Sequence, residues 1–245
     1  MKPMPFPRIT GEGLCAWMGP AFILILIPAW LNMGFLPPPS PQSSADEIAA
    51  FFRKNADEIK LGAMMTMQFC MLGLFWTAAI FVQLKRTKSQ LAQTLSYLQF
   101  IAGAVAYSVF TLPTILWTTI VFRSERPASE ILLLNDFAWL ALVMPVSSAM
   151  IQAAAIGVAI LVDAEKSPIF PRWSGYMNLW VSLTFGPGML ATFFNHGPFA
   201  WDGVFVFYVP LAVFTAWVFV MSYLVSAAAS QKSDQREDSV HSPAG

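Results

Sequence analysis

The chain has 245 residues, of which 56% are hydrophobic and 11% charged, and its formal net charge is zero. A soluble domain usually carries about 25% charged residues, so this composition excludes an ordinary soluble protein. The neutral balance also argues against a nucleic-acid partner, because nucleic-acid-binding proteins concentrate lysine and arginine on one face.

Long apolar runs follow one another along the chain and carry almost no charge. Runs of about 18 residues or more of this kind predict membrane-spanning helices. Six runs meet the criterion, at residues 14–36, 61–84, 95–122, 131–162, 173–194 and 203–229. We therefore expect an all-α, polytopic membrane protein in the lipid bilayer, with one transmembrane domain over residues 1–229 that contains six transmembrane helices.

The connector before the second run predicts an amphipathic interfacial helix over residues 44–60 on the outer face. Ser44 and Glu47 have the spacing of a capping box, in which each side chain accepts a hydrogen bond from the other residue's backbone N–H. Apolar residues then recur at helical spacing, with charged residues on the other faces. Such a helix is either a lid over an external site or a lead-in to the second run, and both interpretations stay open.

Small residues form a face on the fourth run, where Ala149, Ala153 and Gly157 recur at every fourth position. A face of this kind lets two membrane helices approach closely. The partner helix can belong to the same chain or to another one, so this face also predicts a homo- or hetero-oligomer contact.

Several prolines lie inside the runs, among them those at positions 28, 113, 145, 187 and 210. Proline removes a helical hydrogen bond and commonly kinks the helix. The sequence Gly186-Pro187-Gly188 predicts the strongest break, in the middle of its run. Many transporters build their sites at broken helices near the bilayer midplane.

Lysine and arginine in the connectors predict the orientation. With six helices, both termini and the loops 85–94 and 163–172 share one side, which holds nine of these residues against five on the other. Cytoplasmic loops are enriched in lysine and arginine, so we expect both termini in the cytoplasm and the protein in the plasma (inner) membrane. The polar segment 230–245 predicts a disordered cytoplasmic tail.

The candidate binding residues lie in or beside the expected outer connectors. Asp136 is the one charged residue inside the six runs, and such residues are functional candidates by default. Asn135 adjoins it, and Arg123 and Arg126 precede it across a short connector. In one interpretation, Asp136 forms an ion pair with Arg123 or Arg126 that secures the helical hairpin.

In the other interpretation, these four residues converge with His196, Trp201 and Asp202 of the next outer connector on an external pocket. Such a pocket would be largely apolar with a few orienting polar groups, as ligand sites usually are.

Catalytic and cofactor motifs are absent from the sequence. There is no pair of intramembrane histidines for haem, no His-Glu-x-x-His zinc motif, no Cys-x-x-Cys, no phosphate-binding loop and no Gly-x-Ser-x-Gly turn. Cys15 and Cys70 are expected at different depths as free thiols. We expect no catalytic residue, no cofactor and no metal.

The leading hypothesis for function is a membrane protein that binds or transports a small apolar or amphipathic compound through an outward-facing pocket. The alternative is a non-catalytic assembly subunit that uses the small-residue face. A membrane-embedded enzyme using Asp136 and His196 is the third hypothesis, and the lack of motifs argues against it.

Overall fold

The computed structural model describes residues 10–123, 125–165 and 168–241, with side chains as far as residue 233. All the regular secondary structure in this part of the chain is helical. In chain order the elements are α1 (Gly11–Asn32), α2 (Ala45–Lys54), α3 (Ala56–Phe69), α4 (Leu72–Leu84), α5 (Gln90–Ser108), α6 (Thr111–Phe122), α7 (Ala128–Val143), α8 (Ser147–Leu161), α9 (Arg172–Phe185), the 3₁₀ segment η1 (Gly186–Thr192), the π-helical segment η2 (Val204–Tyr208) and α10 (Val209–His241).

Five helical stretches of the described chain are long and apolar enough to cross a membrane. They are Gly11–Asn32, Ala56–Leu84, Gln90–Phe122, Ala128–Leu161 and Val204–Ser233. The protein is therefore a polytopic helical membrane protein. The fifth expected run, 173–194, is not among these stretches. Its α-helix stops at Phe185, where Gly186-Pro187-Gly188 converts the chain to the η1 geometry.

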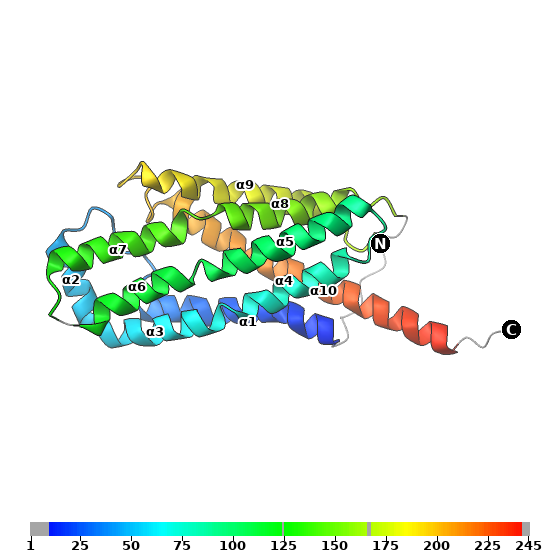
Figure 1. Cartoon of the computed structure of the whole chain (residues 1–245), viewed down its shortest axis with the longest axis horizontal. Helices are drawn as coiled ribbons and strands as arrows, with labels where there is room; N and C mark the ends of the chain where they lie inside the picture. The colour runs from blue at the N-terminus through cyan, green and yellow to red at the C-terminus, as the bar shows by residue number, and fades with distance from the viewer. Residues whose placement is uncertain (1–9, 124, 166–167, 242–245) are drawn as a thin grey trace.

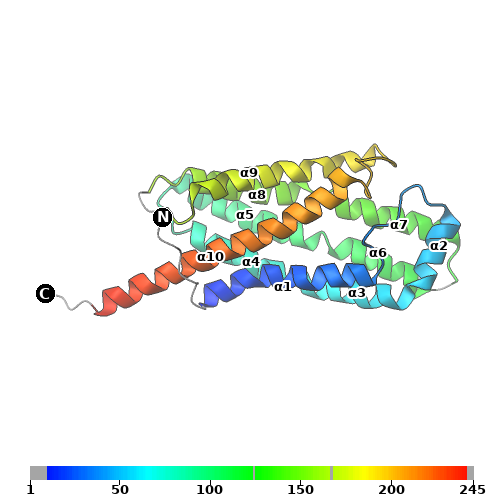
Figure 2. The same ribbon diagram turned by 180° about the vertical axis from the view of Figure 1, so that it is seen from behind.

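The long helices lie side by side as an elongated bundle (Figure 1). α1 packs against α4 and α10, and α8 packs between α5 and α9. Seen from behind, α10 crosses the bundle obliquely (Figure 2). α1 begins and α10 ends at the same end of the bundle, whereas α2 lies at the opposite end. We call these the Glu12 end and the α2 end.

The amphipathic helix is shorter than expected. Its capping box is present, with the Ser44 N–H donating to Glu47 at 2.7 Å and the Glu47 N–H donating to the Ser44 hydroxyl at 3.3 Å. α2 ends at Lys54, and after Asn55 the chain turns into α3, so residues 56–60 belong to the second membrane stretch. α2 packs on the ends of α6 and α7, and the side chain of Arg53 donates to the Arg126 carbonyl at 3.0 Å.

The small-residue face is used inside the chain. A Cβ atom on Gly157 would lie 2.8 Å from the Gly175 carbonyl oxygen of α9, and Ala153 is fully buried. Ala149 lines an internal cavity. α5 and α9 of the same chain pack against α8 and account for this face at Ala153 and Gly157. The homo- or hetero-oligomer contact stays a prediction.

Two smaller expectations concern the thiols and the tail. Cys15 and Cys70 are free, as expected. α10 continues through residues 230–241, where the sequence predicts disorder. At the start of that stretch Lys232 is bonded to Glu12, whereas the disorder and cytoplasmic location of the tail stay predictions.

Candidate binding site

The surroundings of Asp136 differ from the predicted ion pair. Its carboxylate accepts a hydrogen bond from the Asn135 amide at 3.3 Å, and the described residues give it no ion pair with Arg123 or Arg126. Arg126 instead pairs with Glu130 at 3.5 Å. Glu130 lies in the first turn of α7, and Asp136 follows six residues, or about 9 Å, further along the helix axis. Arg123 is exposed.

The next outer connector holds the other predicted residues. His196 is exposed, and its Nδ1 atom lies 2.8 Å from the Asn195 side-chain oxygen. Trp201 is buried and donates its indole N–H to the Pro39 carbonyl at 2.9 Å, while Asp202 is half-buried. No hydrogen bond or ion pair among the described residues joins this group to Asp136. Their convergence on an external pocket stays a prediction.

The structure instead contains a cavity inside the bundle. Its volume is about 150 Å³, and residues from α1, α5, α7, α8, α9, η2 and α10 line it. Seven of the lining side chains are aromatic, namely Trp30, Tyr107, Phe110, Phe185, Phe207, Phe214 and Trp217. None of the described residues that line the cavity is charged.

Four helix interruptions surround this cavity. They separate α5 from α6, α7 from α8, α9 from η1, and η2 from the regular part of α10. Each has a proline at or just after it, which removes the hydrogen bond to the carbonyl four residues earlier. For Pro113 and Pro210 those carbonyls belong to Val109 and Val206, two residues that line the cavity. Pro28, by contrast, lies inside an uninterrupted α1.

The breaks also pack against one another. A Cβ atom on Gly188, which follows the break after α9, would lie 2.5 Å from the Val143 carbonyl oxygen at the end of α7. Only glycine allows the two interrupted chains to come this close. The prediction that Gly186-Pro187-Gly188 makes a strong break is confirmed.

Aromatic rings form much of the cavity wall. Trp30 stacks on Phe207 with ring centroids 6.1 Å apart and an interplanar angle of 13°. Tyr107 lies beside Phe214 at 6.3 Å, and Phe185 lies beside Trp217 at 6.4 Å. This wall is apolar and its rings are held by their neighbours, as in preformed sites for small ligands.

The cavity is not fully enclosed. Among its lining residues, Pro145 is exposed, and Ala106, Val109, Ser148, Pro210 and Leu211 are half-buried. Ala106, Val109, Pro145 and Ser148 lie near the middle of the stretches Gln90–Phe122 and Ala128–Leu161. This part of the wall therefore lies at the depth where a bilayer has its hydrocarbon core.

The described residues form no polar passage from Asp136 to the break at Pro187. Neither residue lines the cavity, and most of its wall is apolar. The site is thus deeper and less polar than the external pocket that the sequence predicts. The interior prolines were the only sign of this cavity in the sequence. The sequence alone does not show that they lie close together, because that depends on how the helices pack.

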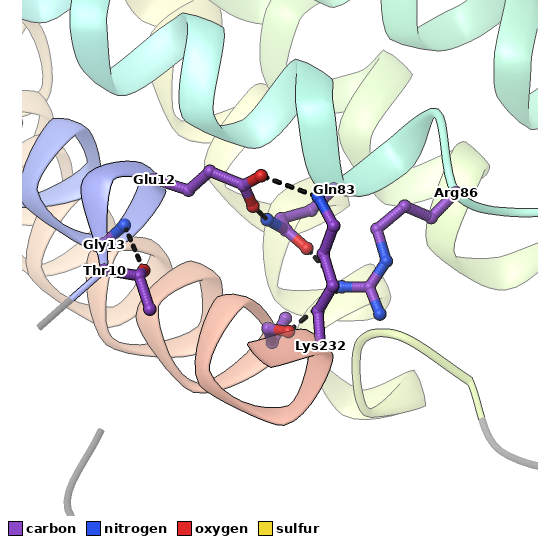
Figure 3. Close-up of polar contacts among 7 residues, drawn as sticks. Thr10, Glu12, Gly13, Gln83, Arg86 and Lys232 are labelled. Carbon is purple, nitrogen blue, oxygen red and sulfur yellow. Dashed lines mark hydrogen bonds and ion pairs between the residues drawn. The ribbon is translucent and has the colours of Figure 1, made fainter. Parts of the chain in front are cut away.

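A second polar group lies at the Glu12 end and escaped the sequence analysis (Figure 3). Glu12 accepts hydrogen bonds from Lys232 at 2.6 Å and from Gln83 at 2.5 Å. Arg86 donates to Gln83 at 2.5 Å and to the Ala228 carbonyl at 3.0 Å. Glu12 precedes the first apolar run, so sequence reasoning left it outside the bundle. The group connects α1, α4 and α10.

The described residues contain no group of three or more histidine, cysteine, aspartate or glutamate side chains that could hold a metal ion. Comparisons with protein-family models, curated proteins and solved structures find no match to this chain.

Proposed function

We propose that this protein binds a small apolar or amphipathic compound in the cavity at the four helix interruptions. The observation that carries the proposal is that these interruptions, which lie far apart in the sequence, surround one cavity of about 150 Å³. Interrupted helices are uncommon unless neighbours or a cavity accommodate the freed backbone groups.

The wall of the cavity supports a bound apolar occupant. Seven aromatic side chains line it, and none of the described lining residues is charged. Ligand pockets are usually lined in this way.

We further propose six membrane passes, with α9 and η1 together forming the fifth. In support, α9 runs along the bundle beside α8, from the Glu12 end toward the α2 end, and α10 returns (Figures 1 and 2). Six passes bring both termini to the Glu12 end. The excess of nine lysine and arginine residues over five then favours a cytoplasmic location for that end in the plasma membrane.

Transport of the same compound is the second candidate function. The interruptions favour it, because broken helices can change their arrangement around a central site. The assembly-subunit alternative stays a proposal with less support, since the small-residue face is covered within the chain at Ala153 and Gly157. The external pocket formed by Arg123, Arg126, Asn135, Asp136, His196, Trp201 and Asp202 remains a proposal.

Photolabelling with benzophenone tests the binding proposal. Benzophenone is small, apolar and aromatic, and on illumination it inserts into nearby C–H bonds, so mass spectrometry can map where it was bound. We expect labelling of cavity residues in the detergent-solubilised protein. Ala149→Phe should fill the cavity and reduce this labelling at least tenfold, whereas Ala154→Phe, on the same helix but outside the lining, should not.

Ala106→Leu narrows the cavity from the α5 wall and serves as a second blocking variant if Ala149→Phe does not fold. Labelling that is spread over lipid-facing residues, and that neither blocking variant reduces, would refute the proposal. Thermal unfolding of each variant shows whether the fold is intact.

A further inference from the structure

We infer that the compound is an uncharged aromatic molecule that places one apolar ring, and no hydrogen-bonding group, in the cavity. This inference rests on the proposed function, because it narrows the chemical class of the compound bound in the same cavity.

Several polar side chains of the cavity wall are bonded within the protein. Trp217 donates its indole N–H to the Asn178 side chain at 2.7 Å. Gln152 donates to the Thr77 hydroxyl at 3.3 Å, and the whole residue is only 1% exposed. Ser148 donates to the backbone carbonyl three residues earlier at 3.3 Å. These side chains therefore already have partners.

The two other polar groups of the wall are out of reach. The Tyr107 hydroxyl and the Trp30 N–H have no partner in the described part of the chain, but each of these atoms has almost no accessible surface. A compound in the cavity would contact the two rings and not their polar atoms. The side chains of the wall thus offer a hydroxyl or carbonyl no replacement for the hydrogen bonds that it makes in water, and they offer a charged group still less.

The volume and the rings of the wall favour one aromatic ring. Apolar cavities of about 150 Å³, the volume of this one, stay dry and take up benzene. Aromatic rings pack against one another edge to face or offset. Such contacts already occur within the wall, where Phe185 and Trp217 lie 6.4 Å apart with an interplanar angle of 68°. A saturated lipid chain would gain no contact of this kind.

The incomplete part of the wall lies where such a compound is dissolved. Pro145 is exposed and Ala106 is half-buried, both near the middle of membrane stretches. Apolar aromatic compounds dissolve in the hydrocarbon core at this depth, whereas amphipathic rings collect at the headgroups. Because the cavity is not fully enclosed, benzophenone can place one ring inside it and leave the other outside.

Competition against benzophenone labelling tests the inference with two molecules of matched shape. Toluene and phenol have the same ring, and a methyl group in the first replaces the hydroxyl of the second. The concentration that halves cavity labelling is measured for each compound and expressed as its concentration in the detergent phase, which removes the difference in partitioning. Labelling of lipid-facing residues in the same sample is the internal control and should not change.

We expect toluene to halve cavity labelling at a concentration at least tenfold below that of phenol, because the phenol hydroxyl loses its hydrogen bonds in the cavity. Tri-tert-butylbenzene is also apolar but too bulky to insert its ring, and it should not compete. Phenol that competes as well as toluene would overturn the inference, since a freed backbone carbonyl would then be accepting its hydroxyl. Benzophenone labelling of the cavity would still support the proposed function.

A hydroxyl added to the wall should reduce the preference for toluene. Ala149 lines the cavity, whereas Ala154 is on the same helix outside the lining. In Ala149→Ser the new oxygen can accept a hydrogen bond from phenol, so we expect the preference to fall about threefold or more. Ala154→Ser should keep the wild-type preference. Equal preferences in the two serine variants would overturn the inference.

Two other results are equally decisive. If decane displaces the label better than toluene does, the occupant is a lipid chain and the inference is wrong. If no competitor reduces cavity labelling and the blocking variants have no effect either, the proposed function fails and the inference fails with it.

Discussion

The buried polar side chains of this bundle divide into those that have a hydrogen-bond partner in the described structure and those that have none. Trp201 and Trp217 have hydrogen-bond partners, and each ties its helix or loop to another part of the chain. Tyr107 and Trp30 have none within the described structure, although they are equally buried. The sequence shows all four as aromatic residues in apolar runs, because partnership depends on neighbours that are distant in the chain.

The polar group at the Glu12 end leads to the first prediction, which concerns stability. Glu12→Gln removes the negative charge that forms an ion pair with the Lys232 ammonium at 2.6 Å. Both side chains of this pair are half-buried. We expect a loss of about 1–3 kcal/mol in the free energy of unfolding, measured as thermal unfolding in mild detergent. The control is Glu165→Gln, which breaks the more exposed pair with Lys88 and should cost about 0–1 kcal/mol. Equal effects of the two changes would contradict the prediction.

Asp136 gives the second prediction. Its half-buried carboxylate has a hydrogen bond from Asn135 but no cationic partner among the described residues. Asp136→Asn should therefore leave thermal stability unchanged or raise it by about 1 kcal/mol, because it removes an unbalanced charge. A clear loss of stability would show that an ion pair forms after all. Loss of a small molecule that co-purifies with the wild type, detected by mass spectrometry, would instead support the external contact.

Helix interruptions and close helix contacts determine where the helices end and how they pack. Interior prolines predicted the interruptions, since the missing N–H is a property of the residue itself. The length of α2 was predicted less well. The amphipathic pattern continues to residue 60, whereas the chain turns at Asn55 so that the following residues join the membrane stretch.

The contact between α8 and α9 leads to a prediction about stability. Gly157→Ala places a methyl group 2.8 Å from the Gly175 carbonyl oxygen, which belongs to the backbone and cannot turn aside. We expect a loss of roughly 1–3 kcal/mol in thermal unfolding, because the two helices must separate.

Gly11→Ala is the matched control, because a Cβ atom at that position meets nothing within 4 Å. It should be neutral or stabilising by less than about 1 kcal/mol. If Gly157→Ala were as stable as Gly11→Ala, the close packing of α8 on α9 would be wrong.

The number of membrane passes depends on the path of all the helices taken together. Five stretches satisfy length and hydropathy, and α9 with η1 does not, because a 14-residue helix followed by a 3₁₀ segment is a poor span by those measures alone. The path of α9 along the bundle nevertheless favours a crossing (Figure 1).

Cysteine labelling distinguishes the two topologies. In a background with Cys15 and Cys70 replaced by alanine, single cysteines are introduced at Ala164, before α9, and at Asn195, after η1. Six passes predict that a membrane-impermeant maleimide labels Asn195→Cys from outside intact cells and Ala164→Cys only after permeabilisation. Labelling of both positions from the same side would show that α9 and η1 do not cross.

Composition and local pattern were enough to predict a helical membrane bundle, the capping box at Ser44 and the break at Gly186-Pro187-Gly188. These features depend on residues that are adjacent or within one helical turn, so a single sequence contains their physical cause. Two interpretations stayed open for Asp136 and for the small-residue face. The described residues give Asp136 no ion pair with Arg123 or Arg126, and α9 of the same chain packs on Gly157. A single sequence could not decide either question, because each depends on how far apart two helices lie and in what register.

The cavity was decided by tertiary structure alone. Pro113, Pro145, Pro187 and Pro210 are separated by up to 97 positions, and nothing local shows that their interruptions meet. Only the packing of α5, α7, α8 and α9 with α1 and α10 brings the interruptions together around one cavity. The sequence determined that the helices would break, because a proline's missing N–H is a local property, and the assembled bundle determined that the breaks would surround a cavity.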